Sequence, residues 1–89
     1  MQTRFLKKFS KDLDKFTQPK DKKAILQIIQ NVKECNSLED IPNVKKLTGY
    51  ANAFRIRSDN LRVGVFVDDQ KTVEFARIAF RKDIYNIFP

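Results

Sequence analysis

Hydrophobic residues in the first part of the chain recur at helical spacing. Leu6, Phe9, Leu13 and Phe16 follow one another at three or four residues, the spacing of one face of an α-helix. This helix should end before Pro19, because a proline disfavours helical backbone in the preceding residue. A second stripe predicts a helix from about residue 19 to about residue 35, with Ala24, Ile25, Ile28, Ile29, Val32 and Cys35 on its apolar face. A short turn between the two predicts an antiparallel helical hairpin.

The later part of the chain alternates with period two instead. Three segments, 53–57, 61–68 and 72–79, show this alternation, which is typical of half-buried strands. Turn-forming residues at 58–60 and 68–71 separate them, so we expect an antiparallel meander.

The remaining segments have weaker patterns. Residues 2–5 read as a short edge strand, and residues 36–53 as an irregular stretch with one short helical turn and a loop that leads into the meander. Near the end, Ile84, Tyr85 and Phe88 are spaced for a short C-terminal turn or helix.

These elements predict one α+β domain over residues 1–89, in the order β-α-α-β-β-β with the short C-terminal turn or helix after it. The helical hairpin must bury its apolar stripe, and one face of the meander is the available surface.

The first two meander strands carry three closely spaced arginines. A two-residue turn at Asp59-Asn60 would place Arg57 opposite Arg62 and Arg55 opposite Gly64, so that all three arginines share one face. The apolar residues Phe54, Ile56, Leu61, Val63, Val65 and Val67 would share the other face, toward the helices. Facing arginines repel by on the order of a few tenths of a kcal/mol, and Gly64 would leave a hollow beside them. Either this is a solvated basic face or it is a site for an anion.

The overall charge favours an anionic partner. Eighteen basic residues against 11 acidic ones give a net charge of +7, which is typical of proteins that bind nucleic acid or acidic protein segments. Guanidinium groups bind phosphate through two parallel hydrogen bonds. Phe66 falls on the arginine face by alternation and could stack on a base.

Several kinds of chemistry are excluded by composition. With no histidine and a single cysteine, the chain has no internal disulfide, zinc site or histidine-based triad. We expect no metal and no small-molecule cofactor. No apolar run approaches the roughly 20 residues needed to span a bilayer, and the charged N-terminus lacks an apolar signal core. We therefore expect a cytoplasmic protein without a membrane partner.

Two longer motifs connect these features to a known family. In order and length, the chain resembles the RelE/ParE superfamily of bacterial toxins from type II toxin–antitoxin modules, through the helical hairpin followed by "VKKLTGYANAFRIRSDNLRVGVFV" and "VEFARIAFRKDIY". Similarity to the RelE-like branch implies a ribosome-dependent endoribonuclease that cuts mRNA in the ribosomal A site. It also implies contacts to ribosomal RNA through basic surfaces, and neutralisation by a cognate acidic antitoxin.

The resemblance assigns functional roles to particular residues. Cleavage would begin with attack of a ribose 2′-hydroxyl on the adjacent phosphate, and the negative charge of the resulting phosphorane needs stabilisation. The expected catalytic residues are Arg57, Arg62, Arg81 and Tyr85, and the expected RNA-binding residues are Lys45, Lys46, Arg55, Phe66 and Lys82.

The sequence also departs from the family pattern. Phe80 stands where many relatives have a histidine that can act as a general acid, and arginines replace lysines that other relatives have on the first meander strand. Arginine is a poor proton acceptor, so the general base and general acid stay unassigned. Asp59 and Glu74 are the nearest carboxylates by sequence. Two alternatives stay open: a ParE-like protein that inhibits DNA gyrase without chemistry, and an inactive member that only binds an antitoxin.

Overall fold

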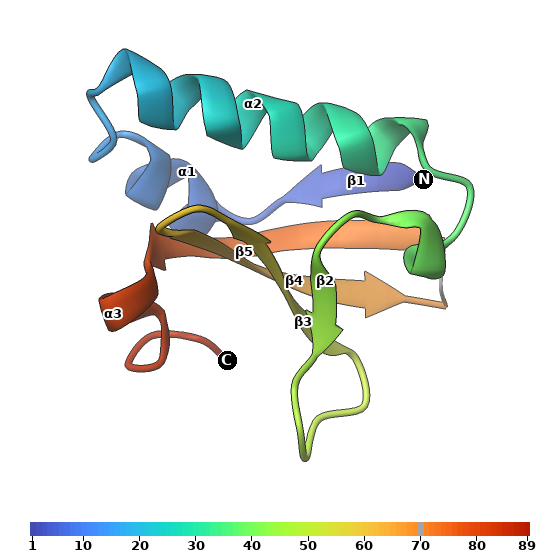
Figure 1. Ribbon diagram of the computed structural model, residues 1–89. Coiled ribbons are helices and arrows are strands. Elements are labelled where there is room, and N and C mark those ends of the chain that lie inside the picture. Colours follow the sequence, from blue (N-terminus) through green and yellow to red (C-terminus); the bar gives the residue numbers. More distant parts are fainter. Residues whose placement is uncertain (70) are drawn as a thin grey trace.

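A five-stranded sheet runs through the molecule, and the two N-terminal helices lie along one side of it (Figure 1). The computed structural model describes residues 1–69 and 71–89. In chain order the elements are β1 (Gln2–Phe5), α1 (Lys7–Leu13), α2 (Pro19–Glu34), a 3-10 turn (Leu38–Asp40), β2 (Val44–Lys46), β3 (Ala53–Ser58), β4 (Leu61–Asp68), β5 (Thr72–Phe80) and α3 (Arg81–Ile84). The predicted α+β class, helical hairpin, meander and short C-terminal helix are confirmed.

The strands are ordered β1-β5-β4-β3-β2 across the sheet. The edge strand β1 runs parallel to β5, while the other neighbours are antiparallel. The hairpin of β3 and β4 has the predicted register, with Arg57 opposite Arg62 and Arg55 opposite Gly64. Asp59 adopts a φ of 50° in the two-residue turn, a left-handed conformation that Asp tolerates better than most residues.

The prediction that residues 36–53 are irregular was wrong in one respect, because residues 44–46 form the additional strand β2. It pairs antiparallel with β3 and places Lys45 opposite Arg55. Three residues are too few to show an alternating pattern, so the strand is defined by the hydrogen bonds that β3 offers at its edge.

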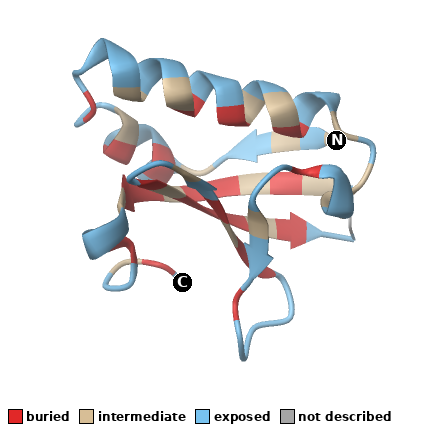
Figure 2. Ribbon diagram, viewed as in Figure 1, coloured by how far each residue is buried: buried red, intermediate tan, exposed pale blue. Residues whose placement is uncertain are grey.

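The main core lies between the sheet and the apolar faces of α1 and α2, as the sequence predicts. Phe9 of α1 and Ile25, Ile28 and Val32 of α2 are buried. They pack in one cluster with the predicted inward-facing residues of β3 and β4, Phe54, Ile56, Leu61, Val63, Val65 and Val67. Figure 2 shows these buried positions on the helix undersides and along the central strands. Within the described part of the chain, no helix is long and apolar enough to cross a membrane.

A second, smaller cluster lies on the opposite face of the sheet and was not predicted. It joins Ile84 and Phe88, from α3 and the residues after it, to Leu47, Ala53, Ala76 and Ala79. A β-bulge near Gly64 and Val65 shifts the pairing of β4 with β5, which interrupts the strict alternation expected over 72–79. The turn predicted at 68–71 includes Gln70, which lies outside the described residues.

The open hollow predicted at Gly64 was wrong. The ring of Phe88 occupies this space, since a Cβ atom added at Gly64 would lie 2.5 Å from the Phe88 Cγ and Cδ2 atoms. The sequence indicates the missing side chain but not what fills its place.

Candidate functional site

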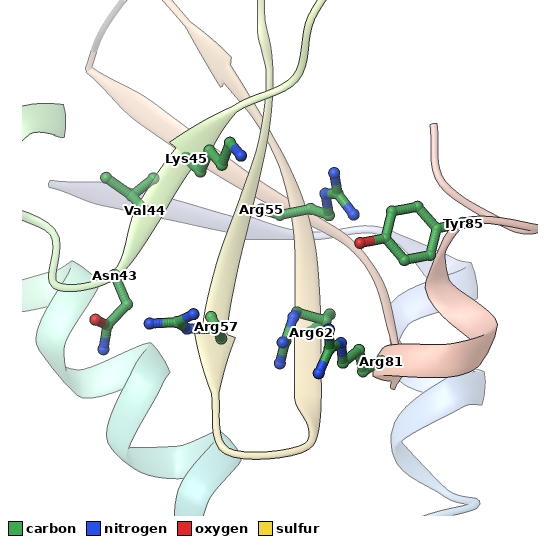
Figure 3. A pocket seen from close by; sticks show the side chains of 8 residues that line it. All are labelled: Asn43, Val44, Lys45, Arg55, Arg57, Arg62, Arg81 and Tyr85. Atoms are coloured by element: carbon green, nitrogen blue, oxygen red, sulfur yellow. The ribbon is translucent and has the colours of Figure 1, made fainter.

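Basic side chains from three strands and the C-terminal helix meet in one cleft of about 390 Å³. Figure 3 shows the lining side chains, which come from β3 and β4, from α3 and the residue after it, and from β2 and the residue before it: Asn43, Val44, Lys45, Arg55, Arg57, Arg62, Arg81 and Tyr85. Five of the eight are cations, and none of the eight is a carboxylate. The cleft is therefore a concentrated positive site.

The β3–β4 turn fixes two of these arginines. The Arg62 side chain donates from Nη1 to the backbone oxygens of Asp59 and Leu61, both at 2.8 Å. The Arg81 backbone N–H donates to the oxygen of Asn60 at 2.8 Å, which ties the start of α3 to the same turn. Two residues that are 19 positions apart in the sequence are thus held by adjacent peptide units.

Like charges crowd around Arg62. Its cross-strand neighbour is Arg57, and the pKa of Arg62 is lowered by partial burial first, then by the positive charges of Arg81, Arg57 and Arg55, against an opposing effect of Tyr85. Neither of the ion pairs found in the described part of the chain includes a cleft residue. The cleft cations therefore repel one another, and a bound anion would relieve that repulsion.

Tyr85 supplies the aromatic surface of the cleft. The residue is 66% exposed, and the guanidinium carbon of Arg55 lies 4.5 Å from the ring centroid, a cation–π contact. The pKa of Tyr85 is lowered, by hydrogen bonding to Arg55 first and then by the positive charges of Arg55, Arg81 and Arg62. The nearby cations therefore favour the charged phenolate form of Tyr85.

Six of the nine predicted site residues line the cleft. They are Lys45, Arg55, Arg57, Arg62, Arg81 and Tyr85. Lys46 and Lys82 are exposed outside it. Phe66 is half-buried and its ring packs against Phe88, with the centroids 5.1 Å apart, so it is part of the second cluster rather than of the cleft.

The residues considered for proton transfer lie elsewhere. Glu74 pairs with Arg4 on the neighbouring edge strand, Nη1 to Oε2 at 2.8 Å. Asp59 contributes its backbone oxygen to Arg62, while the residue itself lines a different groove, between α2 and β3. Phe80 packs edge-on against Phe16, at 5.2 Å between centroids. None of these three side chains lines the cleft.

Asn43 and Val44 line the cleft but were missed from the sequence, because β2 itself was not predicted. Asn43 has a φ of 61°, and its backbone oxygen accepts a hydrogen bond from the Arg57 N–H at 3.2 Å. An asparagine directly after a proline is a common signal for such a left-handed turn, and this signal could have placed a chain reversal before β2.

The chemistry available here is anion binding and charge stabilisation. Converging guanidinium groups can bind a phosphate and stabilise the extra negative charge that develops when the phosphate is attacked. In the described residues there is no group of three or more His, Cys, Asp or Glu side chains arranged to hold a metal ion.

Known proteins similar to this chain in sequence and in structure are toxins of toxin–antitoxin systems. No protein-family model matches the chain. Toxin RelE3 of Methanocaldococcus jannaschii is 41% identical over 90 residues, which cover 100% of both chains. A toxin–antitoxin complex of RelB and RelE from Methanococcus jannaschii contains a chain that is 40% identical with a TM-score of 0.78, over 97% of this chain and 99% of that one. A chain in the RelBE2 toxin–antitoxin complex of Mycobacterium tuberculosis has the same fold, with a TM-score of 0.72 and 24% identity over 90% of this chain and 96% of that one.

Proposed function

The chain belongs to the RelE family of toxins, and on that premise we propose that it is the toxin of a toxin–antitoxin module that cleaves mRNA on the ribosome. The observation that carries this proposal is the cleft in which Lys45 and four arginines converge without a carboxylate. A site of this kind suits the phosphodiester backbone of RNA. The relatives found are RelE toxins, which favours this branch over a ParE-like inhibitor of gyrase.

The reaction is attack of a ribose 2′-oxygen on the adjacent phosphorus. The new bond gives a 2′,3′-cyclic phosphate, the bond to the 5′-oxygen breaks, and the 2′-hydroxyl proton leaves while the departing 5′-oxygen gains one. Arg62 and Arg81 stabilise the phosphorane, because the β3–β4 turn holds the Arg62 guanidinium and the backbone of Arg81 close together before RNA arrives. Arg57, the cross-strand neighbour of Arg62, adds a further positive charge from β3.

The remaining cleft residues bind and orient the substrate. Lys45 and Arg55 face each other across β2 and β3 and contact flanking phosphates. Tyr85 offers an exposed ring on which a base can stack. Arginines stay protonated at any cellular pH, so among the lining residues Tyr85 is the side chain best suited to proton transfer. The lowered pKa of Tyr85 favours that role for its hydroxyl.

The partner that we propose is a cognate antitoxin. The similar chain from Methanococcus jannaschii was crystallised with its antitoxin RelB. A toxin with a net charge of +7 is complementary to an acidic, partly disordered segment that orders on binding. Such a segment would compete with RNA wherever it contacts the cleft cations.

The test is cleavage of ribosome-bound mRNA by the wild type and by the Arg62→Ala/Arg81→Ala variant, with cut sites mapped by primer extension. We expect cuts that leave a 2′,3′-cyclic phosphate and a 5′-hydroxyl. The variant should lose at least about 100-fold in rate, the loss seen when one group that stabilises a transition-state charge is removed.

A matched control removes the same charge elsewhere. Lys8→Gln/Lys11→Gln lowers the net charge by the same two units on the exposed surface of α1 and should retain cleavage. Equal loss in the control and the cleft variant would mean that overall charge matters rather than the cleft. Inhibited gyrase with intact mRNA would support the ParE-like function, and antitoxin binding without either activity would indicate an inactive member.

A further inference from the structure

Gly64 in the middle of β4 makes room for an aromatic ring from the end of the chain. A Cβ atom at this position would lie 2.5 Å from Cγ and Cδ2 of Phe88 and 2.7 Å from its Cδ1. Carbon atoms in favourable contact are about 3.5–4.0 Å apart, so no side chain fits at Gly64 while the ring stays in place. Phe88 is 6% exposed, and its ring also packs on Phe66.

This contact lies beside the cleft. Gly64 is directly opposite Arg55 on β3, and Arg55 is the residue whose guanidinium lies over the Tyr85 ring. The absence of a side chain at Gly64 and the position of Tyr85 are thus linked through a single cross-strand pair.

Buried residues on both sides of Tyr85 hold the C-terminal segment. Ile84 is 0% exposed. The backbone N–H groups of Ile87 and Phe88 both donate to the Ile84 oxygen, at 3.2 and 3.0 Å, so that residues 84–88 form one compact turn. Tyr85 itself is largely exposed, which means that its neighbours rather than its own packing determine where its ring lies.

A second, polar anchor holds the same turn. Arg77 of β5 donates from Nη1 to the Ile87 oxygen at 3.5 Å, and its guanidinium is fixed by the carboxylate of Asp12. The long distance makes this the weaker anchor. Phe88 in the space above Gly64 is the stronger one.

We propose that Gly64 is a positioning residue for the cleft: by admitting the Phe88 ring, it fixes the C-terminal turn and thereby holds Tyr85 over Arg55. The consequence for cleavage rests on the proposed function, whereas the placement of Tyr85 can be measured without RNA.

Tyr85 can be observed directly, because the chain has two tyrosines and no tryptophan. In a Tyr50→Phe background, Tyr85 is the sole phenol, and its ionisation can be followed by absorbance as the pH is raised. Hydrogen bonding to Arg55 of β3 first, and then the positive charges of Arg55, of Arg81 of α3 and of Arg62 of β4, lower its pKa. Adding Gly64→Ala should raise this pKa toward the ordinary value of about 10. It should also reduce mRNA cleavage about 100-fold, as expected when a substrate-contacting group is misplaced by about 1 Å.

Further variants separate this effect from damage to β4. Phe88→Ala releases the turn without changing the strand and should shift the Tyr85 pKa in the same direction. Gly64→Ala/Phe88→Ala should match Phe88→Ala alone, since the added methyl group then meets no ring. Asn86→Ala, at an exposed position in the same turn, should leave the titration as in the parent.

The outcomes decide between the two claims. An unchanged Tyr85 pKa in folded Gly64→Ala and Phe88→Ala proteins, or additive effects in the double variant, would overturn the positioning role. If Gly64→Ala does not fold, as judged by circular dichroism, the Phe88→Ala titration decides alone. A parent protein that leaves mRNA intact would overturn the proposed function, while the titration would still establish or reject the placement of Tyr85.

Discussion

Arg77 and the four arginines of the cleft are held in opposite ways. Arg77 forms a two-pronged pair with Asp12 of α1, from Nε to Oδ2 at 2.7 Å and from Nη2 to Oδ1 at 3.0 Å. The backbone N–H of Ile78 also donates a hydrogen bond to Oδ2 of Asp12, at 3.1 Å. The four cleft arginines have no such partner, since both ion pairs in the described ranges lie outside the cleft.

The pKa values reflect this difference. The pKa of Arg77 is raised by its hydrogen bond to Asp12 first and by the charge of that carboxylate, against the effect of burial. The pKa of Arg62 is lowered by burial first and then by its cationic neighbours. An arginine with its counter-ion built in stabilises the fold, whereas the arginines without one are those that we propose bind an anion from outside.

The largest expected difference is in stability. Arg77→Ala should lower the free energy of unfolding by about 3 kcal/mol, because the buried Asp12 carboxylate loses its partner. Arg62→Ala should cost about 1 kcal/mol or less, since it removes two hydrogen bonds but also relieves repulsion. Urea unfolding followed by circular dichroism measures both values.

Removing both members of the pair provides the control. Asp12→Ala/Arg77→Ala leaves no charge buried alone and should recover part of the stability lost in Arg77→Ala. Equal losses for Arg77→Ala and Arg62→Ala would contradict the division into structural and functional arginines.

A smaller effect is expected from acidification. Burial by itself would raise the pKa of Asp12, but the hydrogen bonds from Arg77 and Ile78 and the charges of Arg77 and Lys15 lower it below its usual value of 3.8. The stabilisation is therefore fully present above that value and is lost as the pH falls through the lower pKa of the folded state.

The Asp12→Asn variant tests this assignment. The wild type should lose more free energy of unfolding than Asp12→Asn when the pH is lowered from about 5 to about 2. Parallel losses in the two proteins would assign the acid sensitivity to other carboxylates.

The two groups also differ in how far they could be predicted from the sequence. The hairpin register of Arg57, Arg62 and Arg55 follows from local information, namely alternation in two strands and a two-residue turn between them. The pair of Asp12 and Arg77 joins residues 65 positions apart. A signal was present, because Asp12 lies three residues after Phe9 on the apolar stripe of its helix, but alternation alone cannot identify the partner of a buried charge.

The features that complete the cleft could not be predicted from local patterns either, because they also depend on contacts between distant parts of the chain. Strand β2 consists of three residues that depend on the edge of β3. The ring of Phe88 reaches Gly64 through a turn with no repeating pattern. Position 85 was assigned by family resemblance, whereas its contact with Arg55 depends on the packing of the C-terminal turn.

The smallest expected effect is the repulsion within the cleft. Arg57→Gln removes the charge opposite Arg62 and should raise the free energy of unfolding by a few tenths of a kcal/mol at low salt. This gain should disappear near 1 M salt, where the screening length falls to about 3 Å. Lys8→Gln removes the same charge from an exposed position on α1, and its smaller effect gives the baseline. A destabilised Arg57→Gln protein would mean that Arg57 has a structural partner, as Arg77 has. A salt-sensitive gain confined to Arg57→Gln would show that the fold tolerates the cleft charge at a cost, which an anion would remove on binding.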